Sequence, residues 1–562
     1  MKLRAIGSFA ATIGLGALLS AFVLTSPLGI RAQEKKSARD SSVSDPILRA
    51  LQAELARSKA QLKMENVGAP FYIEYRVFDV EQFEANAAFG ALREQNRTRL
   101  RLLRALVRLG DYKIDSNYQS GQGVSDIIPL DGDELALRHQ IWLATDQAYK
   151  GAGEALSAKQ SLLKQLNVEQ PVDDFAKAEP VQSIGPVATL DIDPAKWTRM
   201  LESATSVYKN DSQIQTFGAN LSFITLNEYF TNTEGSVTRQ GSTHYLITLA
   251  ASEQAPDGMR LDRSPQYASN RIEEMPTSEA LQSDALKLVE QMKQLREAPV
   301  VEEDYRGPVL FSNDAAADMF FDLIAPNILG GRPGPGRPAR TLGNFASSLK
   351  SRVLPEFLSV VDDPTTEKFG GKSLSGSYKI DDEGVQVTPV TVVNNGQLEN
   401  FLIGRQPIRD FSTSNGHGRA AGSGSTAPAP GNLFIRASKT STHEELKKQM
   451  LDKCRDRGLP YGYFVDTLGP RLTPRILYRV WVKDGHEEIV RGAIFNELDT
   501  RALRSDLSAA GDDPLVSNRA GIPFSSIVSP SVLFDELEVK RADNTKEKLP
   551  DYPAPPLISA HN

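Results

Sequence analysis

The sequence predicts an α+β protein in which a mixed α/β amino-terminal domain, residues 45–298, precedes a β-rich carboxyl-terminal domain, residues 299–545. Three observations predict this class. Helical and strand-like patterns alternate up to residue 298, and strand-like patterns dominate after residue 360. The composition, 40% hydrophobic and 24% charged in 562 residues, is typical of a globular chain of two or three domains.

Residues 1–32 have the order of an export signal. Lys2 and Arg4 precede an uncharged apolar run, and small residues follow up to Ala32, where we expect cleavage. The expected location is therefore periplasmic or extracellular. The apolar run approaches the length that spans a bilayer, so an uncleaved membrane anchor is the alternative. We expect a disordered linker at residues 33–44 and a loose tail at residues 546–562.

The elements of the amino-terminal domain follow from periodicity and capping residues. Asp45 is suited to cap the first helix, whose apolar residues recur near the helical period. A leucine-rich segment, residues 98–115, fits a helix by its spacing, but a strand is the alternative. The other elements expected are a helix at 45–63, strands at 69–80 and 84–92 that pair with each other, helices at 134–166, 193–208 and 277–296, and strands at 220–229 and 236–249.

The carboxyl-terminal domain is expected to begin at residues 300–312. Asn313 is suited to cap a helix over residues 314–325, which Pro326 ends because proline has no N–H to donate. Residues 330–340 hold too much proline and glycine for regular structure, and we interpret them as a linker or a mobile lid. One further helix is expected at residues 442–457.

The net charge limits the classes of binding partner, and the cysteine count limits how the fold is stabilised. Export would remove Lys2, Arg4 and Arg31 from the 64 basic residues, which leaves 61 against 71 acidic residues and a net charge of −10. Nucleic acid is therefore an unexpected partner, because phosphate binding needs a basic surface. The one cysteine, Cys454, excludes an internal disulfide, so the fold depends on its core.

Residues 360–405 carry the most informative pattern. Asp362-Asp363 precedes Gly370-Gly371, and the acidic run 381–383 followed by Gly384 stands before an alternating apolar run from Val385 to Val393. Asn394-Asn395-Gly396 is typical of a hairpin turn. This order resembles the carboxyl-terminal domain of the TldD/PmbA family, also called modulator of DNA gyrase proteins. The resemblance implies a scaffold of zinc metallopeptidases that cut unfolded peptides in an enclosed chamber, and an assembly as homodimers or heterodimers with a paralogue.

The resemblance also implies where zinc would be bound. Active members carry HExxxH on a helix and a third cysteine ligand near the carboxyl terminus, and such sites leave a fourth position open for water. Aligned on the alanines of residues 315–317, the two histidine positions hold Phe321 and Pro326, and the glutamate position holds Asp322. Residues 509–526 contain no cysteine. We therefore expect no metal cofactor, and zinc is the alternative.

The remaining candidates come from the same comparison. Asp382 and Glu383 are candidate catalytic carboxylates, with a framework role as the alternative. His417 and Arg419 lie in a glycine-rich loop that resembles a cleft-lining segment of the family, and Asn432 lies in the strand expected to close the site. These three are the expected substrate-binding residues, and Arg419 is suited to a peptide carboxylate. A relocated metal site of His417 with residues 381–383 would suit a hard cation better than zinc.

These features predict a zinc-less homologue that binds a peptide or unfolded polypeptide, or that pairs with a catalytic subunit in proteolysis. The alternative is a metallopeptidase of the TldD type with altered ligands, in which Asp322 or Asp382 would be essential. Whether the chain is an enzyme therefore stays open on the sequence. A third reading is an exported assembly subunit without a ligand in its cleft.

Overall fold

The computed structural model describes residues 45–65, 67–167, 172–337, 339–422 and 425–542. The signal expected at residues 1–32, the linker expected at 33–44 and the tail expected at 546–562 lie outside these residues. The described part contains seven α-helices and three large β-sheets, which confirms the α+β class. Within it, no helix combines the length and the apolar character needed to cross a bilayer.

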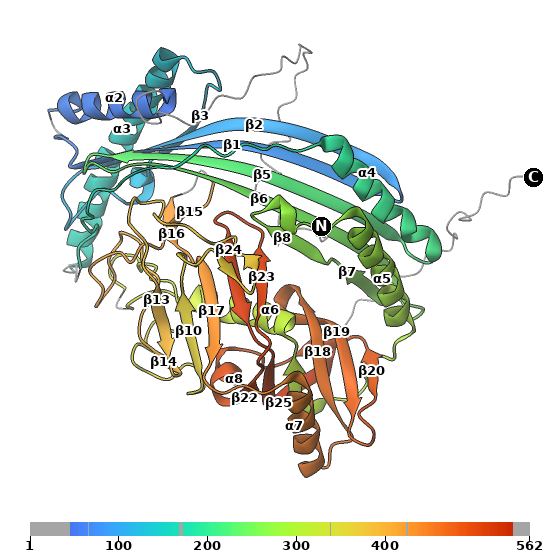
Figure 1. The fold of residues 1–562 in the computed structure, drawn as a ribbon. Coiled ribbons are helices and arrows are strands. Elements are labelled where there is room, and N and C mark those ends of the chain that lie inside the picture. The colour runs from blue at the N-terminus through green and yellow to red at the C-terminus, as the bar shows by residue number, and fades with distance from the viewer. Residues whose placement is uncertain (1–44, 66, 168–171, 338, 423–424, 543–562) are drawn as a thin grey trace, which may run out of the picture.

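A strongly curved sheet of eight strands forms the amino-terminal half (Figure 1). Its main order is β3-β2-β1-β5-β6-β4, and β7 and β8 both pair with β6. The strands are β1 (Tyr72–Ala88), β2 (Ala91–Arg108), β3 (Val124–Ile128), β4 (Gln182–Ile184), β5 (Thr216–Asn232), β6 (Val237–Gln254), β7 (Arg260–Arg263) and β8 (Gln266–Ser269). The first long pair turns at Phe89 and Gly90, both at positive φ.

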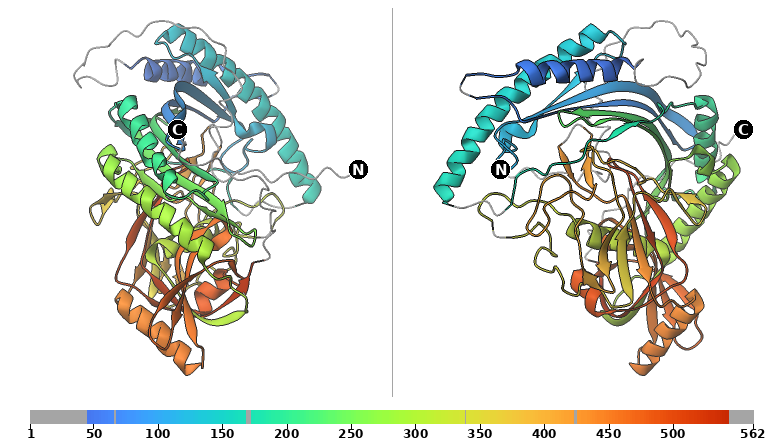
Figure 2. Two further views of the ribbon diagram at one scale, coloured as in Figure 1. Left: turned by 90° about the vertical axis from the view of Figure 1, so that its right-hand side faces the viewer. Right: turned by 60° about the vertical axis from the view of Figure 1, so that its left-hand side comes forward.

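Helices cover one face of this sheet and leave the other to the carboxyl-terminal half. The four helices are α2 (Pro46–Gln61), α3 (Glu134–Leu166), α4 (Pro194–Thr205) and α5 (Ser278–Glu297). Alternate residues of β1 such as Tyr75 and Phe83 pack beneath them in two apolar cores. Residues of the opposite parity, such as Phe78 and Val80, face the concave side, beneath which the carboxyl-terminal sheets lie (Figures 1 and 2).

Two further sheets and helix α6 (Asn313–Ile324) enclose the largest apolar core. One sheet has the order β14-β13-β10-β17-β24-β23, with β10 (Leu358–Asp362), β13 (Val390–Asn394), β14 (Gln397–Leu398), β17 (Asn432–Ala437), β23 (Leu515–Arg519) and β24 (Ser525–Ser529). The other has the order β20-β19-β18-β9-β25-β21, with β22 also paired to β25. Its strands are β9 (Tyr305–Phe311), β18 (Tyr461–Gly469), β19 (Thr473–Trp481), β20 (Glu487–Val490), β21 (Ala493–Phe495), β22 (Leu507–Ala510) and β25 (Val532–Arg541).

Smaller elements complete this half. Two short hairpins are β11 (Lys368–Phe369) with β12 (Lys372–Ser373), and β15 (Gly418–Ala420) with β16 (Thr426–Pro428). The β15–β16 hairpin points at the concave face of the large sheet, where Ala420 packs against Phe78 and Val80 (Figure 1). The remaining helices are α7 (His443–Asp456) and α8 (Thr500–Ser505).

Several helix ends lie where capping chemistry places them. The Asp45 carboxylate accepts from the Ile47 N–H at 2.9 Å, and α2 begins directly after it. Asp193 caps α4 and Thr277 caps α5 in the same way. Thr442 and Glu445 form a reciprocal capping box at the start of α7. The predicted Asp45 and Asp193 caps and the predicted helices at 277–296 and 442–457 are thus confirmed, because capping is a local interaction.

Three expectations are corrected, and one open choice between helix and strand is decided. Residues 84–88 continue strand β1 and are not its partner, which is β2. For the leucine-rich segment 98–115, the strand alternative is confirmed through Arg108, which ends β2. Ser312, and not Asn313, caps α6, because its hydroxyl accepts from the Ala315 N–H at 3.0 Å. Val385 and Val387 precede β13 in irregular backbone, where residues 381–384 turn the chain.

Candidate functional site

Helix α6 presents the residues that stand in the zinc-ligand positions. Its buried side contains Ala316, Met319 and Phe320, which pack into the largest core. Phe321 is half-buried, whereas Asp322 and Pro326 are exposed. The helix ends at Ile324, so Pro326 lies beyond it in a short 3₁₀ turn (Ala325–Asn327).

These three residues do not fit a zinc ion. Phenylalanine and proline side chains have no lone pair to give a metal, so Asp322 is the single ligand-type residue of the three positions. Over the described part of the chain, no group of three or more His, Cys, Asp and Glu residues is arranged to hold a metal ion. Cys454 lies buried in α7, where it packs beneath Gly462 of β18.

The segment expected to supply the third ligand does meet α6, but it brings an arginine. Arg519 ends strand β23 and forms an ion pair with Asp318 of α6. Its guanidinium carbon lies 5.0 Å from the centre of the Phe321 ring. A fixed positive charge therefore lies beside the helix face where the family resemblance placed a metal cation, and like charges repel. Burial raises the pKa of Asp322, and Arg519 opposes that shift.

Asp381 braces the turn at residues 381–384. Its carboxylate accepts from the N–H groups of Glu383 at 3.0 Å, Val385 at 2.8 Å and Gly418 at 2.9 Å. Burial and the neighbouring Glu383 carboxylate raise the pKa of Asp381 to about 8, although these N–H groups act in the opposite direction. The turn is thereby fixed against β15.

Asp382 joins the two halves of the molecule. Its carboxylate accepts from the Ala420 N–H at 2.5 Å and from Arg419 Nε at 3.3 Å, while its carbonyl oxygen accepts from Arg76 of the large sheet. Glu228 of β5 lies against it, and burial together with the Asp382 charge raises the pKa of Glu228 well above its usual value. The two facing carboxyl groups are therefore coupled, because the charge of Asp382 disfavours ionisation of Glu228.

Glu383 is equally enclosed. Its two oxygens accept from the Arg405 N–H and, at 2.7 Å, from the Thr426 hydroxyl. A methyl group added at Gly418 would lie 2.2 Å from its Oε2, so only glycine fits there. Asp382 and Glu383 are both at most 5% exposed, and their hydrogen bonds explain them as framework residues.

The three expected substrate-binding residues are also occupied by internal contacts. His417 is fully buried, with Nε2 3.2 Å from the Asp362 carboxylate and Nδ1 3.1 Å from the Asn415 carbonyl oxygen. Arg419 pairs with Asp382, and its guanidinium carbon lies 3.9 Å from the centre of the Tyr378 ring.

Asn432 holds a loop in place. Its amide donates to the Thr366 carbonyl oxygen at 2.9 Å and to the Ser377 hydroxyl at 3.1 Å. Its carbonyl oxygen Oδ1 is buried and has no hydrogen-bond partner among the described residues. The side chain is fully buried, so it does not line a surface that a ligand can reach.

The structure thus divides the predicted site into two groups. Asp382, Glu383, His417 and Arg419 lie together around β15, beneath the concave face of the large sheet. Asp322 lies on α6 beside Arg519 and, within the described residues, shares no hydrogen bond or ion pair with the other group.

Sequence reasoning missed the partners that come from distant parts of the chain: Glu228, Arg76, Arg405 and Arg519. The sequence pattern could have identified Glu228. It has the same strand parity as Leu226 and Phe230, so it is a charged residue on an apolar face. No sequence pattern identifies Arg519, since its role depends on the packing of β23 against α6.

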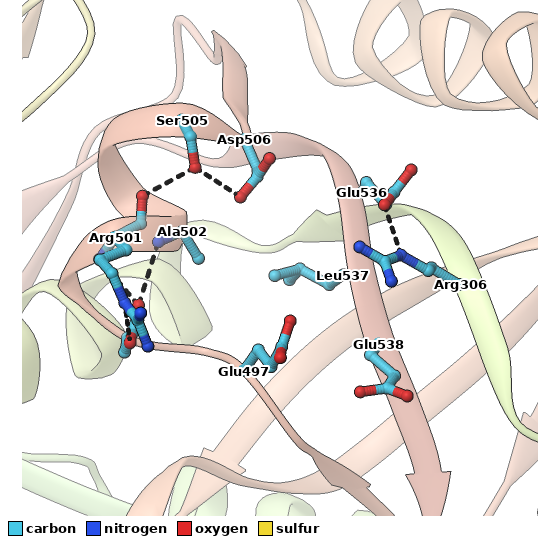
Figure 3. Close-up of a pocket in the computed structure, with 10 residues that line it drawn as sticks. Arg306, Glu497, Arg501, Ala502, Ser505, Asp506, Glu536, Leu537 and Glu538 are labelled. Carbon is cyan, nitrogen blue, oxygen red and sulfur yellow. Dashed lines mark hydrogen bonds and ion pairs between the residues drawn. The ribbon is translucent and has the colours of Figure 1, made fainter.

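A separate cavity of about 230 Å³ opens between α8 and β25 (Figure 3). It contains none of the predicted site residues. Its lining is acidic, with Glu497, Asp499, Asp506, Glu536 and Glu538. Neighbouring arginines neutralise part of this charge, as Arg306 pairs with Glu536 and Arg501 with Asp499. These ion pairs explain the carboxylates without a ligand.

Known proteins resemble this chain in sequence and in fold. Residues 304–541 match the family model of the PmbA/TldA metallopeptidase C-terminal domain. A metalloprotease of Methanocaldococcus jannaschii is 35% identical over 104 residues, which are 18% of this chain and 22% of that protein. A metalloprotease of Archaeoglobus fulgidus is 28% identical over 130 residues, or 23% of this chain and 27% of that protein. The chain therefore matches about a quarter of the length of these curated relatives.

Solved structures share the fold over most of the chain. TldE from Thermococcus kodakarensis has a TM-score of 0.59 at 14% identity, and the alignment covers 87% of this chain and 99% of that one. A Thermotoga maritima protein described as a candidate modulator of a DNA gyrase has a TM-score of 0.58 at 17% identity, with 87% and 100% covered. These likenesses establish the fold. Together with the family model, they identify residues 304–541 as a PmbA/TldA-type carboxyl-terminal domain in a chain that has the fold of these proteins.

Proposed function

We propose that this chain is a zinc-less TldD/PmbA protein that binds an extended polypeptide, alone or as the partner of a catalytic subunit in proteolysis. The observation that carries the proposal is the meeting point of α6 and β23. Phe321 and Pro326 stand in the two histidine positions, and the Arg519 guanidinium lies against the Phe321 ring. A metal ion would find one ligand-type side chain, Asp322, in the three motif positions and a competing positive charge beside them.

The concave sheet face supports a polypeptide as the ligand. Ile127 of β3 is 67% exposed and pairs in register with the half-buried Leu102. Leu226 and Ile224 of β5 present half-buried apolar side chains on the same face. Extended chains place alternate side chains on such a surface, so an unfolded segment with apolar residues is the ligand class that suits it.

The proposal extends to location and assembly. The basic, apolar and small-residue order of residues 1–32 supports export, and members of the family assemble as dimers. We propose a homodimer or a heterodimer with a paralogue that carries the zinc motif. A neighbouring coding region with HExxxH would be the natural source of such a paralogue.

The alternative is a metallopeptidase with altered ligands, which the names of the two curated relatives favour. One experiment separates the two. Purified full-length protein is mixed with reduced, carboxymethylated α-lactalbumin, with and without added zinc. We expect saturable binding and an intact substrate in both conditions. Cleavage that depends on zinc and is lost in Asp322→Ala would establish the peptidase instead.

A further inference from the structure

Arg519 has one edge of its guanidinium that makes no hydrogen bond. Nη1 is engaged by the Asp318 carboxylate, whereas Nε and Nη2 are buried and have no partner among the described residues. These two nitrogens form one edge of the planar group, which is the edge that binds oxygen acceptors through parallel hydrogen bonds. The edge is thus a donor pair with nothing bound to it.

Buried donors without acceptors are rare and destabilise a fold. The Arg519 side chain is 24% exposed and its partner Asp318 is 29% exposed, so the site lies at the rim of the molecule. An incoming oxygen atom would supply the acceptor that the protein itself does not provide.

The negative charges around Arg519 favour a neutral carbonyl oxygen over an anionic oxygen as the ligand. Asp314, Asp318 and Asp322 succeed one another at intervals of four along α6, against Arg519 and Arg263 as the neighbouring cations. Carboxylates one helical turn apart repel one another, and the pKa of Asp314 is accordingly raised by burial and then by the charge of Asp318. A further anion would meet the same repulsion, whereas a neutral carbonyl oxygen would not.

The flanks of this edge are aromatic and continuous with the concave sheet face. The Phe321 ring lies beside the guanidinium, and the turn after Arg519 carries Phe524, which stacks on His244 of β6 with ring centres 3.3 Å apart. His244 pairs in register with Ile224, one of the half-buried apolar residues of the concave face. The turn that follows Arg519 therefore packs against the same sheet face on which we propose that the polypeptide binds.

We propose that the free edge of Arg519 binds a main-chain carbonyl oxygen of the bound polypeptide, in the place where active relatives would use a metal. This inference depends on the polypeptide binding proposed above. It assigns Arg519 as a binding residue. It also predicts that affinity for the polypeptide requires the planar, two-donor geometry of the guanidinium in addition to its charge.

The test compares two variants of the full-length protein. The probe is fluorescein-labelled, reduced and carboxymethylated α-lactalbumin, and its Kd is measured by fluorescence anisotropy. Arg519→Lys keeps the charge but removes the fork, and we expect the Kd to rise about tenfold or more. Asp318→Asn is the matched control, since it breaks the same ion pair and keeps the fork, and we expect a Kd within about twofold of the wild type.

A second probe distinguishes a main-chain carbonyl oxygen from a terminal carboxylate as the group that Arg519 binds. Decapeptides of randomised sequence are compared with free and with amidated carboxyl termini, and carbonyl recognition predicts equal Kd values. A loss of about tenfold on amidation would identify a terminal carboxylate and overturn the proposal. So would an equal loss in Asp318→Asn and Arg519→Lys, or an unchanged Kd in Arg519→Lys. If the wild type binds neither probe, polypeptide binding itself is wrong, and the role of Arg519 is wrong with it.

Discussion

At the scale of single residues, chemistry that suits catalysis has been used for structure. Asp382 and Glu383 have the residue types of a general acid and base, yet each is held by main-chain and side-chain donors. His417 with Asp362 is a buried pair of the kind that orients a base, and it lies away from any described surface. Residue type therefore predicted residues that the fold brings together, and their internal hydrogen bonds support the framework role that was the alternative.

The difference between the two candidate acids is measurable. Asp382→Ala would leave Arg419 and the Ala420 N–H without their acceptor inside the protein, and we expect a loss of about 3 kcal/mol in the free energy of unfolding. Asp322→Ala removes an exposed side chain, and its effect should stay within about 0.5 kcal/mol. Urea unfolding compares both variants with the wild type, and equal effects would contradict the framework role of Asp382.

At the scale of elements, the sequence predicted what local interactions decide. Asp45, Asp193, Thr277 and Thr442 cap helices because each bonds to N–H groups within three residues along the chain. Strand pairing was harder to predict from the sequence, because residues 84–88 fit a second strand and the end of β1 equally well. The positions of Glu228 and Arg519 could not be predicted, since each meets its partner only through tertiary packing.

The hairpin between β13 and β14 gives a test at this scale. Asn395 and Gly396 both adopt positive φ, as the predicted two-residue turn requires. A methyl group at Gly396 would lie 2.3 Å from the Leu354 carbonyl oxygen, whereas at Gly458, also at positive φ, it would meet nothing within 4 Å. We expect Gly396→Ala to cost more than about 2 kcal/mol in the free energy of unfolding, and Gly458→Ala about 1 kcal/mol. Equal losses in urea unfolding would show that backbone conformation alone decides the cost.

At the scale of the whole molecule, a buried charge cluster joins the curved sheet to the carboxyl-terminal half. Six carboxyl groups face three guanidinium groups there. The acids are Glu74, Glu228, Glu234, Asp381, Asp382 and Glu383, and the bases are Arg76, Arg405 and Arg419. When buried carboxyl groups outnumber the cations beside them, ionising all of them is unfavourable. The protonation of this cluster, and with it the stability of the contact between the two halves, therefore depends on pH.

That coupling has a definite sign. The pKa of Glu228 is raised in the folded protein, so the folded state holds a proton that the unfolded chain releases above its usual pKa of about 4.5. The stability that depends on this proton is present below that value and is lost as pH rises through the raised pKa. Glu228→Gln keeps the shape without the ionisation. We expect the free energy of unfolding, measured at pH 5 and pH 9, to fall with pH by about 1–2 kcal/mol less in Glu228→Gln than in the wild type. Parallel pH profiles would contradict the shared proton.

The central claim is that the family scaffold persists here without its metal. The most direct test is the zinc content of full-length protein, purified without chelator, by mass spectrometry of the metal. We predict less than about 0.1 zinc per chain, with no change in unfolding temperature when EDTA is added. One zinc per chain, removed by chelator together with stability or peptidase activity, would contradict the claim.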